Sequence, residues 1–145
     1  MSNPGSHYDI AVEHTFTASP DKVFDAWLNP QRVEKWFGPG LGEMQPVSID
    51  ANVGGSFRIV QIRNGHAIGH SGKYLVIDRP EHLAFTWGTD DDEGDDEVHI
   101  HLVPVGRGSL LRLVHTIDSQ WKDYADKIHQ SWLAMMKKMD SLLAS

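Results

Sequence analysis

The chain has 145 residues, of which 23% are charged, with a formal net charge of −7 and no cysteine. This length and composition indicate one globular domain over residues 1–145 that can bury a core of its own. The lack of cysteine excludes disulfides, thiolate catalysis and zinc–thiolate sites, and no apolar run reaches the roughly 18 residues that span a membrane.

The N-terminal sequence MSNPGSHYD lacks the apolar core of a signal peptide, so we expect a cytoplasmic protein in which residues 1–7 are disordered. Much of the negative charge falls in the run Asp90–Glu97 (DDDEGDDE). This run does not follow the alternating ligand pattern of a calcium loop, and we interpret it as a solvated hairpin loop. Lys and Arg do not cluster into a phosphate-binding surface, so we expect no nucleic-acid partner.

The first predicted element is a strand in which polar and apolar residues alternate. Its apolar side consists of Tyr8, Ile10, Val12, His14 and Phe16. At Ser19 the pattern changes to that of a short helix, because serine is a suitable N-cap and the proline that follows fits the first helical position. This helix ends before Pro30, and a second short helix extends from Gln31 to Trp36.

The run Gly38–Gly42 (GPGLG) follows the second short helix. No strand leads into it and no Lys-Ser/Thr pair follows it, so we interpret it as a mobile loop and not as a phosphate-binding loop. From residue 47 onwards, runs of strand length alternate with turn residues, at 47–49, 57–62, 71–78, 83–87, 98–102 and 111–117. Hairpin connections make such a sheet antiparallel, with one wet face and one apolar face.

The last predicted element is a helix from Trp121 to Leu143. Apolar residues recur in it at three- and four-residue spacings and form one stripe. An amphipathic helix gains little from its own hydrogen bonds, so the stripe must cover the apolar face of the sheet. Two interpretations stay open: a core helix only, or a helix that also walls a ligand cavity, for which Trp and adaptable Met side chains are well suited.

Five segments resemble one protein family, in order and at similar spacing. They are Ala18–Pro39, Ile49–Arg58, Ser71–Trp87, Leu110–Thr116 and the pair Ser131-Trp132. Together they resemble the activator-of-Hsp90-ATPase-like group of the SRPBCC superfamily, which is also called the START/Bet v 1 superfamily. Two positions depart from the group's pattern: His14 stands where the group often has Arg, and Ser131 replaces the usual Gly.

The resemblance implies an α+β helix-grip fold. In this fold a curved antiparallel sheet of about seven strands wraps around the long C-terminal helix, with two short helices after the first strand. It also implies a deep, mostly apolar pocket between sheet and helix. Carried over residue by residue, the lining of this pocket includes Trp36, Phe57, Phe85, Trp87, Leu113, His115 and Trp132.

His14 and His115 lie on the apolar sides of their predicted strands, where a polar ring needs either a partner or a cavity. They are either satisfied core histidines or polar anchors of the pocket. Gln61 is a candidate third anchor, and Met136 adds a lining residue from the helix. These residues complete the predicted ligand-binding site.

Other polar residues give no catalytic or metal site. His99 and His101 share the outer face of a strand, but no third ligand is placed beside them, so we predict no metal and no cofactor. His70 and Ser71 are neighbours on a strand and point to opposite faces, and no nucleophile elbow is present. The sequence therefore supports no nucleophilic catalysis.

The aromatic inner face, with few ionisable groups, favours a carrier or sensor for a small hydrophobic or aromatic ligand. The alternative is an acid–base enzyme of cyclase or dehydratase type, acting on a polycyclic or polyketide-like compound, although no inward Asp or Glu is evident to tune the histidines. We place an Hsp90 co-chaperone third, because that function in the eukaryotic proteins also depends on a separate N-terminal domain, for which this chain has no room. A homodimer stays possible, because an exposed edge strand or the Gly38–Gly42 loop could form its interface.

Overall fold

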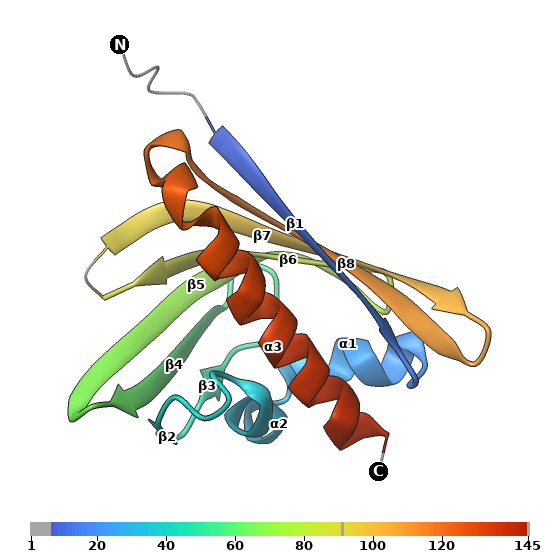
Figure 1. The fold of residues 1–145 in the computed structure, drawn as a ribbon. Helices are drawn as coiled ribbons and strands as arrows, with labels where there is room; N and C mark the ends of the chain where they lie inside the picture. The colour runs from blue at the N-terminus through green and yellow to red at the C-terminus, as the bar shows by residue number, and fades with distance from the viewer. Residues whose placement is uncertain (1–6, 91, 145) are drawn as a thin grey trace.

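The computed structural model describes residues 7–90 and 92–144, and the surroundings of their side chains except at 92–95. Within this part the chain forms one antiparallel sheet, two short helices and a long C-terminal helix (Figure 1). Most of the predicted disordered N-terminus, residues 1–6, lies outside the described residues. His7 belongs to the first strand, because it pairs with Asp118.

The sheet has eight strands in the order β1-β8-β7-β6-β5-β4-β2, and β3 also pairs with β4. The strands are β1 (His7–Phe16), β2 (Glu43–Met44), β3 (Ser48–Ile49), β4 (Ser56–Arg63), β5 (His66–Asp78), β6 (His82–Thr89), β7 (Asp92–Val105) and β8 (Gly108–Asp118). The predicted antiparallel sheet of about seven strands is confirmed. The additional strand β2 has only two residues, which is too short for an alternating pattern to reveal.

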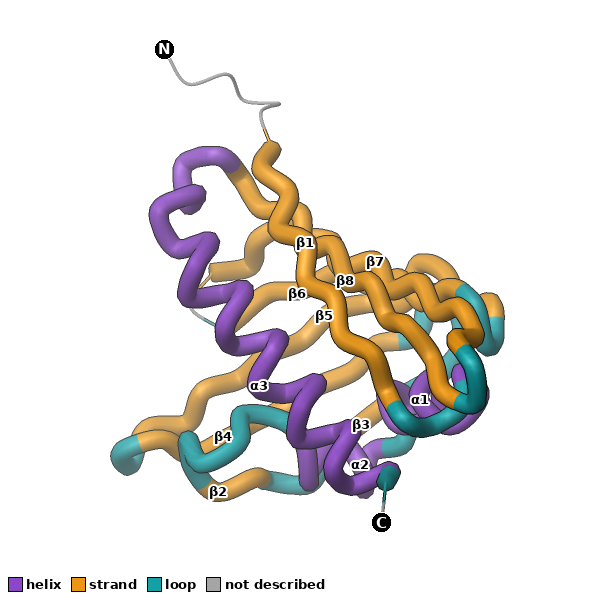
Figure 2. The backbone as a smooth tube through the Cα atoms, turned by 45° about the vertical axis from the view of Figure 1, so that its right-hand side comes forward, coloured by secondary structure: helices purple, strands orange, loops and turns teal. Residues whose placement is uncertain are grey.

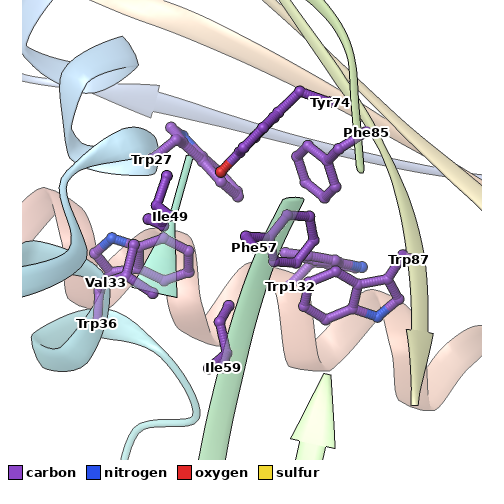
Figure 3. Close-up of a pocket in the computed structure, with 10 residues that line it drawn as sticks. All are labelled: Trp27, Val33, Trp36, Ile49, Phe57, Ile59, Tyr74, Phe85, Trp87 and Trp132. Carbon is purple, nitrogen blue, oxygen red and sulfur yellow. The ribbon is translucent and has the colours of Figure 1, made fainter. Parts of the chain in front are cut away.

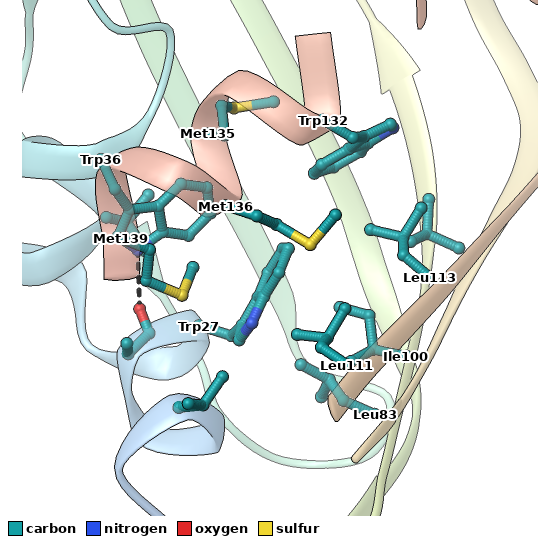
Figure 4. Packing of buried hydrophobic residues seen from close by; sticks show 14 of the residues in the cluster. Trp27, Trp36, Leu83, Ile100, Leu111, Leu113, Trp132, Met135, Met136 and Met139 are labelled. Carbon is teal, nitrogen blue, oxygen red and sulfur yellow. Dashed lines mark hydrogen bonds between the residues drawn. The ribbon is translucent and has the colours of Figure 1, made fainter. Parts of the chain in front are cut away.

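Two short helices follow β1, as predicted, and these are α1 (Pro20–Leu28) and α2 (Pro30–Trp36). Asn29 separates them, and its side chain accepts hydrogen bonds from two backbone N–H groups in the first turn of α2. The indole N–H of Trp36 donates to the carbonyl of Ala26 at 2.9 Å, as the dashed line in Figure 4 shows. This buried hydrogen bond joins the two helices into one unit beside α3 (Ala125–Leu143).

Helix α3 runs across the concave inner face of the sheet (Figure 1, Figure 2). Its buried residues are Trp132, Met135, Met136 and Met139. In Figure 4, Trp132 and Met136 point toward the residues of the sheet, and Met139 lies beside Trp27 and Trp36 of the short helices. The prediction that this helix begins at Trp121 is wrong, because Ser119–Tyr124 form a 3₁₀ helix, η1. The side chain of Asp118 accepts a hydrogen bond from the backbone N–H of Gln120 and begins this tighter turn. Trp121 and Tyr124 are consequently 42% and 55% exposed.

The core is one apolar cluster between α3, the two short helices and the inner face of the sheet. Inward positions of the strands alternate with outward ones, so each central strand gives every second side chain to the core. Large side chains that are fully buried include Phe16, Phe24, Leu83, Ile100, Leu111, Leu113, Ile117, Met136 and Met139. The helix stripe and the apolar face of the sheet therefore meet, as the sequence predicts.

Met136 has no exposed surface and lies in the middle of the buried side of α3. Met136→Ala leaves a cavity in the core, and we expect it to lower the free energy of unfolding by about 2–5 kcal/mol. Lys137→Ala, on the exposed side of the same turn, should change this free energy by no more than about 0.5 kcal/mol. Urea unfolding measures both variants, and equal effects would contradict the assignment of α3 as the core helix.

Candidate functional site

One cavity beside α3 is apolar and nearly filled (Figure 3). Its lining consists of Trp27, Val33, Trp36, Ile49, Phe57, Ile59, Tyr74, Phe85, Trp87 and Trp132. Its free volume is about 20 Å³, little more than the roughly 10–15 Å³ that one water molecule needs. The rings occupy the space themselves: the centroid of Phe57 lies 5.4 Å from that of Phe85 and 5.9 Å from that of Trp87.

The second cavity is larger, about 270 Å³, and has a mixed lining. Its volume is close to the lower end of the range for small-molecule sites, roughly 300–1,000 Å³. Apolar side chains come from Phe37, Trp87, Ile128, Trp132 and Met135. Polar side chains come from Arg63, His70, Thr89, Asp96, His115 and Ser131. Trp87 and Trp132 belong to both linings, so the open space lies on the polar side of these two tryptophans.

His115, on β8, is held in a buried chain of hydrogen bonds at the wall of this second cavity. Its Nδ1 accepts a hydrogen bond from the indole N–H of Trp132 at 3.0 Å, and its Nε2 lies 3.0 Å from Oδ2 of Asp96. An indole nitrogen can only donate, so the proton of the neutral imidazole is on Nε2 and is donated to Asp96. Both ring nitrogens of His115 are therefore engaged, one by α3 and the other by β7.

Asp96 belongs to the acidic run that the sequence suggests to be a solvated loop, and this interpretation is wrong for it. β7 begins at Asp92, and Asp96 pairs with Trp87 of β6 inside the sheet. Its side chain reaches the inner face because it continues the two-residue period of Val98 and Ile100. The alternation from Val98 and Ile100 predicts an inward side chain at Asp96, whereas the high charge of the surrounding run predicts a solvated loop.

The remaining described part of the acidic run has other partners. Asp90 accepts two hydrogen bonds, each 2.8 Å long, from the guanidinium of Arg58. These hydrogen bonds, together with the charge of Arg58, hold the pKa of Asp90 below its ordinary value. Glu97 lies on the exposed outer side of β7. Asp91 and the side chains of residues 92–95 lie outside the described part of the structure.

His70, on β5, is one of the cavity residues that the sequence analysis did not single out for binding. Its ring stacks on Trp87 with 4.9 Å between centroids and meets Phe37 edge-on at 5.3 Å. Its Nδ1 is buried and has no hydrogen-bond partner among the described residues. Burial, with the nearby charge of Arg63, lowers the pKa of His70 to about 4. The ring is therefore neutral at neutral pH, with one buried nitrogen that has no partner in the described part of the chain.

Gln61 holds the loop after α2 and does not line either of the two cavities. Its Nε2 donates to the carbonyls of Gly38 at 2.9 Å and Gly42 at 3.3 Å, and its Oε1 accepts from Nε of Arg63 at 2.7 Å. Gly38 has a positive φ of 49°, and a Cβ there would collide with the amide of Gln61. Gln61 thus positions the loop and also Arg63, which brings a positive charge to the second cavity.

The other predicted lining residues are brought together only in part. Trp36, Phe57 and Phe85 line the first cavity, His115 lines the second, and Trp87 and Trp132 line both. Leu113 and Met136 are buried in the core and line neither cavity.

His14 lines neither cavity because its ring is paired at the end of α3. Its Nε2 lies 3.0 Å from Oδ2 of Asp140, and the other carboxylate oxygen accepts hydrogen bonds from the backbone N–H and hydroxyl of Thr17 at 3.2 and 3.1 Å. Burial acts to raise the pKa of Asp140, but the hydrogen bonds from His14 and Thr17 outweigh it and lower this pKa. These three residues form a clamp between β1 and the C-terminal part of α3.

Comparison with protein families matches residues 17–144 to the family described as activator of Hsp90 ATPase homolog 1-like protein. The chain belongs to this family. Its fold, the SRPBCC fold, commonly binds hydrophobic ligands. A search of curated proteins found no match. Among residues 7–90 and 92–144, no helix has the length and apolar character needed to cross a membrane.

Solved structures show the same architecture. A protein from Chromobacterium violaceum is 26% identical with a TM-score of 0.85, and the match covers 94% of this chain and 98% of that one. A protein from Rhodobacter sphaeroides is 22% identical with a TM-score of 0.87, over 99% and 97% of the two chains. CalU16 from Micromonospora echinospora is 24% identical with a TM-score of 0.72, over 99% and 81%. These likenesses confirm the helix-grip fold of this family member.

Trp132→Phe tests the buried chain of hydrogen bonds. The substitution keeps an aromatic ring in the core but removes the donor to His115 and leaves a buried nitrogen unpaired. We expect the free energy of unfolding to fall by about 1–3 kcal/mol. Trp121→Phe, at an exposed indole of η1, should change it by no more than about 0.5 kcal/mol. Denaturant unfolding measures both, and similar small effects would contradict the Trp132–His115 bond.

The pKa of His70 predicts a pH dependence of stability. His70 takes up a proton near pH 6.5 in the unfolded chain and only near pH 4 in the folded one. Between these values the unfolded state binds more protons, so the contribution is fully present above pH 6.5 and is lost on acidification toward pH 4. From pH 7 to pH 5 this loss is roughly 2 kcal/mol.

His70→Gln should therefore show a weaker loss of unfolding free energy between pH 7 and pH 5 than the wild-type chain. His66→Gln, at an exposed position of the same strand, should keep the wild-type pH dependence. Urea unfolding at the two pH values gives the comparison. Parallel curves for the wild type and His70→Gln would contradict a buried, neutral His70.

Proposed function

We propose that this protein is a carrier or sensor that binds a small aromatic ligand bearing a hydroxyl or carboxylate group. The ligand would occupy the 270 Å³ cavity between α3 and the inner face of the sheet. The observation that carries this proposal is the ring of His70, which belongs to the lining of that cavity and whose buried Nδ1 has no partner among the described residues. A buried polar atom without a partner costs free energy, and a ligand hydroxyl would pair it.

The lining of the cavity supports a ligand with one apolar and one polar part. Trp87, Trp132 and Met135 offer apolar surface for an aromatic ring. His70 and Arg63 lie in the same lining, and the positive charge of Arg63 lowers the pKa of the His70 ring, which indicates that the two side chains are close. A hydroxyl can pair with His70, and a carboxylate can accept from the guanidinium of Arg63.

An acid–base enzyme is the second candidate, because Asp96 places a carboxylate beside His115 at the cavity wall. Such a pair is a frequent element of general acid–base catalysis. Both nitrogens of His115 are already engaged by Asp96 and Trp132, so this ring has no free nitrogen to take a proton from a substrate. His70 has a free nitrogen, but with a pKa of about 4 it is a weak base at neutral pH. Binding without reaction is therefore the better supported function.

The family name refers to activation of the Hsp90 ATPase, and we place this function third. It gives no role to the cavity or to the unpaired nitrogen of His70. Capture of the chaperone in stoichiometric amount by the purified protein would reverse this order.

A thermal-shift screen against phenols, hydroxybenzoates, naphthols, polyketides, fatty acids and steroids tests the proposal. We expect the hydroxylated or carboxylated aromatic compounds to raise the melting temperature. A ligand at one hundred times its dissociation constant adds about 2.7 kcal/mol to the free energy of unfolding. Mass spectrometry of the recovered compound distinguishes binding from turnover.

The screen has two variants and a matched control. His70→Ala and Arg63→Gln should each weaken binding of the compound that gives the largest shift. His66→Ala, at an exposed position of β5, should bind as the wild type does. A shift that survives in both cavity variants, or the absence of a shift with every aromatic compound, would refute the proposed site.

A further inference from the structure

We propose that His82, His99 and His101 form a binding site for a divalent transition-metal ion such as Zn²⁺, on the outer face of the sheet. This site is separate from the cavity, which lies on the inner face, and it does not depend on the ligand-binding function proposed above. The sequence alone indicates only His99 and His101, because the third histidine is distant along the chain.

The sheet register brings the third histidine to the other two. His82 on β6 lies directly opposite His101 on β7, and His99 lies opposite Ala84, two positions along the same ladder. Directly opposite residues in an antiparallel pair point to the same face, and so do residues two apart on one strand. All three imidazoles therefore share one patch of the outer face.

The spacing of the nitrogens is that of a coordination site. The candidate ligand atoms of the three histidines all lie within 4.8 Å of one another. Nε2 of His82 is 3.1 Å from Nδ1 of His99, and the rings of His82 and His101 stack with 4.2 Å between centroids. Ligand nitrogens around tetrahedral zinc, each about 2.0–2.1 Å from the metal, lie roughly 3.3 Å apart. The stacked rings of His82 and His101 would have to turn so that their in-plane lone pairs converge on the ion.

Glu97 orients one of the ligands in the way that metal sites require. Its carboxylate oxygen lies 3.2 Å from Nε2 of His99 and can only accept, so Nε2 carries the proton. The lone pair of His99 is then on Nδ1, which faces Nε2 of His82. A carboxylate that accepts from the far nitrogen of a metal-binding histidine is a recurrent supporting group in metal sites.

Metal binding needs one change of tautomer. Without metal, Nε2–H of His82 donates to the lone pair on Nδ1 of His99. To bind the ion, His82 must carry its proton on Nδ1, which frees the lone pair of Nε2. The ring remains neutral in this change, so no net proton is gained or lost.

The surroundings of the patch suit a cation. Asp78 lies opposite His82 on β5 and contributes negative charge. Arg112 lies opposite His101 on β8, but its guanidinium is 3.6 Å from the carboxylate of Glu13. His101 is exposed, and an ion held there would keep one coordination position open to water or to another molecule.

Isothermal titration of the untagged protein with Zn²⁺ tests the site. We expect one equivalent to bind, with at least a tenfold loss of affinity in His82→Ala and in His101→Ala. Glu97→Gln should keep the three ligands and bind roughly tenfold more weakly, as supporting groups of metal ligands do. His66→Ala, which removes an exposed histidine elsewhere on the sheet, should bind like the wild type. Circular dichroism confirms that each variant is folded.

Titration with Co²⁺ gives an independent readout, because a tetrahedral site produces visible absorption bands that are far more intense than the weak bands of octahedral aqueous cobalt. These intense bands should be absent in His82→Ala. Zinc affinity that is unchanged in His82→Ala and His101→Ala would overturn the proposal. So would affinity that is lost in His70→Ala or His115→Ala instead, since the ion would then bind in the cavity.

Discussion

The structure depends on the packing of the apolar side of α3 against the concave face of the sheet. An antiparallel sheet with one apolar face cannot remain exposed, and an amphipathic helix gains too little from its own hydrogen bonds to persist alone. Trp132 and Met136 lie at the centre of this contact. The clamp of His14, Thr17 and Asp140 then joins the C-terminal part of the helix to β1.

The same contact decides where a ligand can bind. Large aromatic side chains from α1, α2 and the sheet fill one part of the space between helix and sheet, so the deep apolar pocket implied by the resemblance is reduced to about 20 Å³. The open volume lies beside it, where Asp96 and His115 are paired and Nδ1 of His70 has no hydrogen-bond partner among the described residues. A polar cavity of this kind selects a ligand by a few hydrogen bonds as well as by its apolar surface.

Strand β7 contributes side chains to both faces of the sheet, because successive residues of a strand point to opposite faces. Asp96 points to the cavity, while Glu97, His99 and His101 point to the outer face. A change of pairing by one residue would exchange these roles and would expose the apolar positions between them. The burial of Val98 on the inner side therefore sets the register of the ladder that assembles the outer histidines.

Local sequence patterns are enough to predict most of the secondary-structure elements and the family. The alternation of polar and apolar residues predicts the long strands, and Asn29 with the prolines predicts the two short helices. The apolar stripe predicts the buried side of α3. Each of these patterns arises between residues close in the chain. Two predictions from local patterns are wrong. The apolar stripe extends beyond the start of α3 at Ala125, so the predicted helix is too long. The high charge around Asp96 predicts a loop, although Asp96 follows the two-residue alternation of a strand and points inward.

Which polar side chains meet depends on how the strands are ordered and paired. His70, Asp96 and His115 come from three strands, and so their shared cavity requires the order and register of the whole sheet. His82 reaches the other outer histidines through the pairing of β6 with β7. The free volume also depends on how the aromatic rings pack against α3. Such contacts join residues far apart in the chain, and no local spacing encodes them.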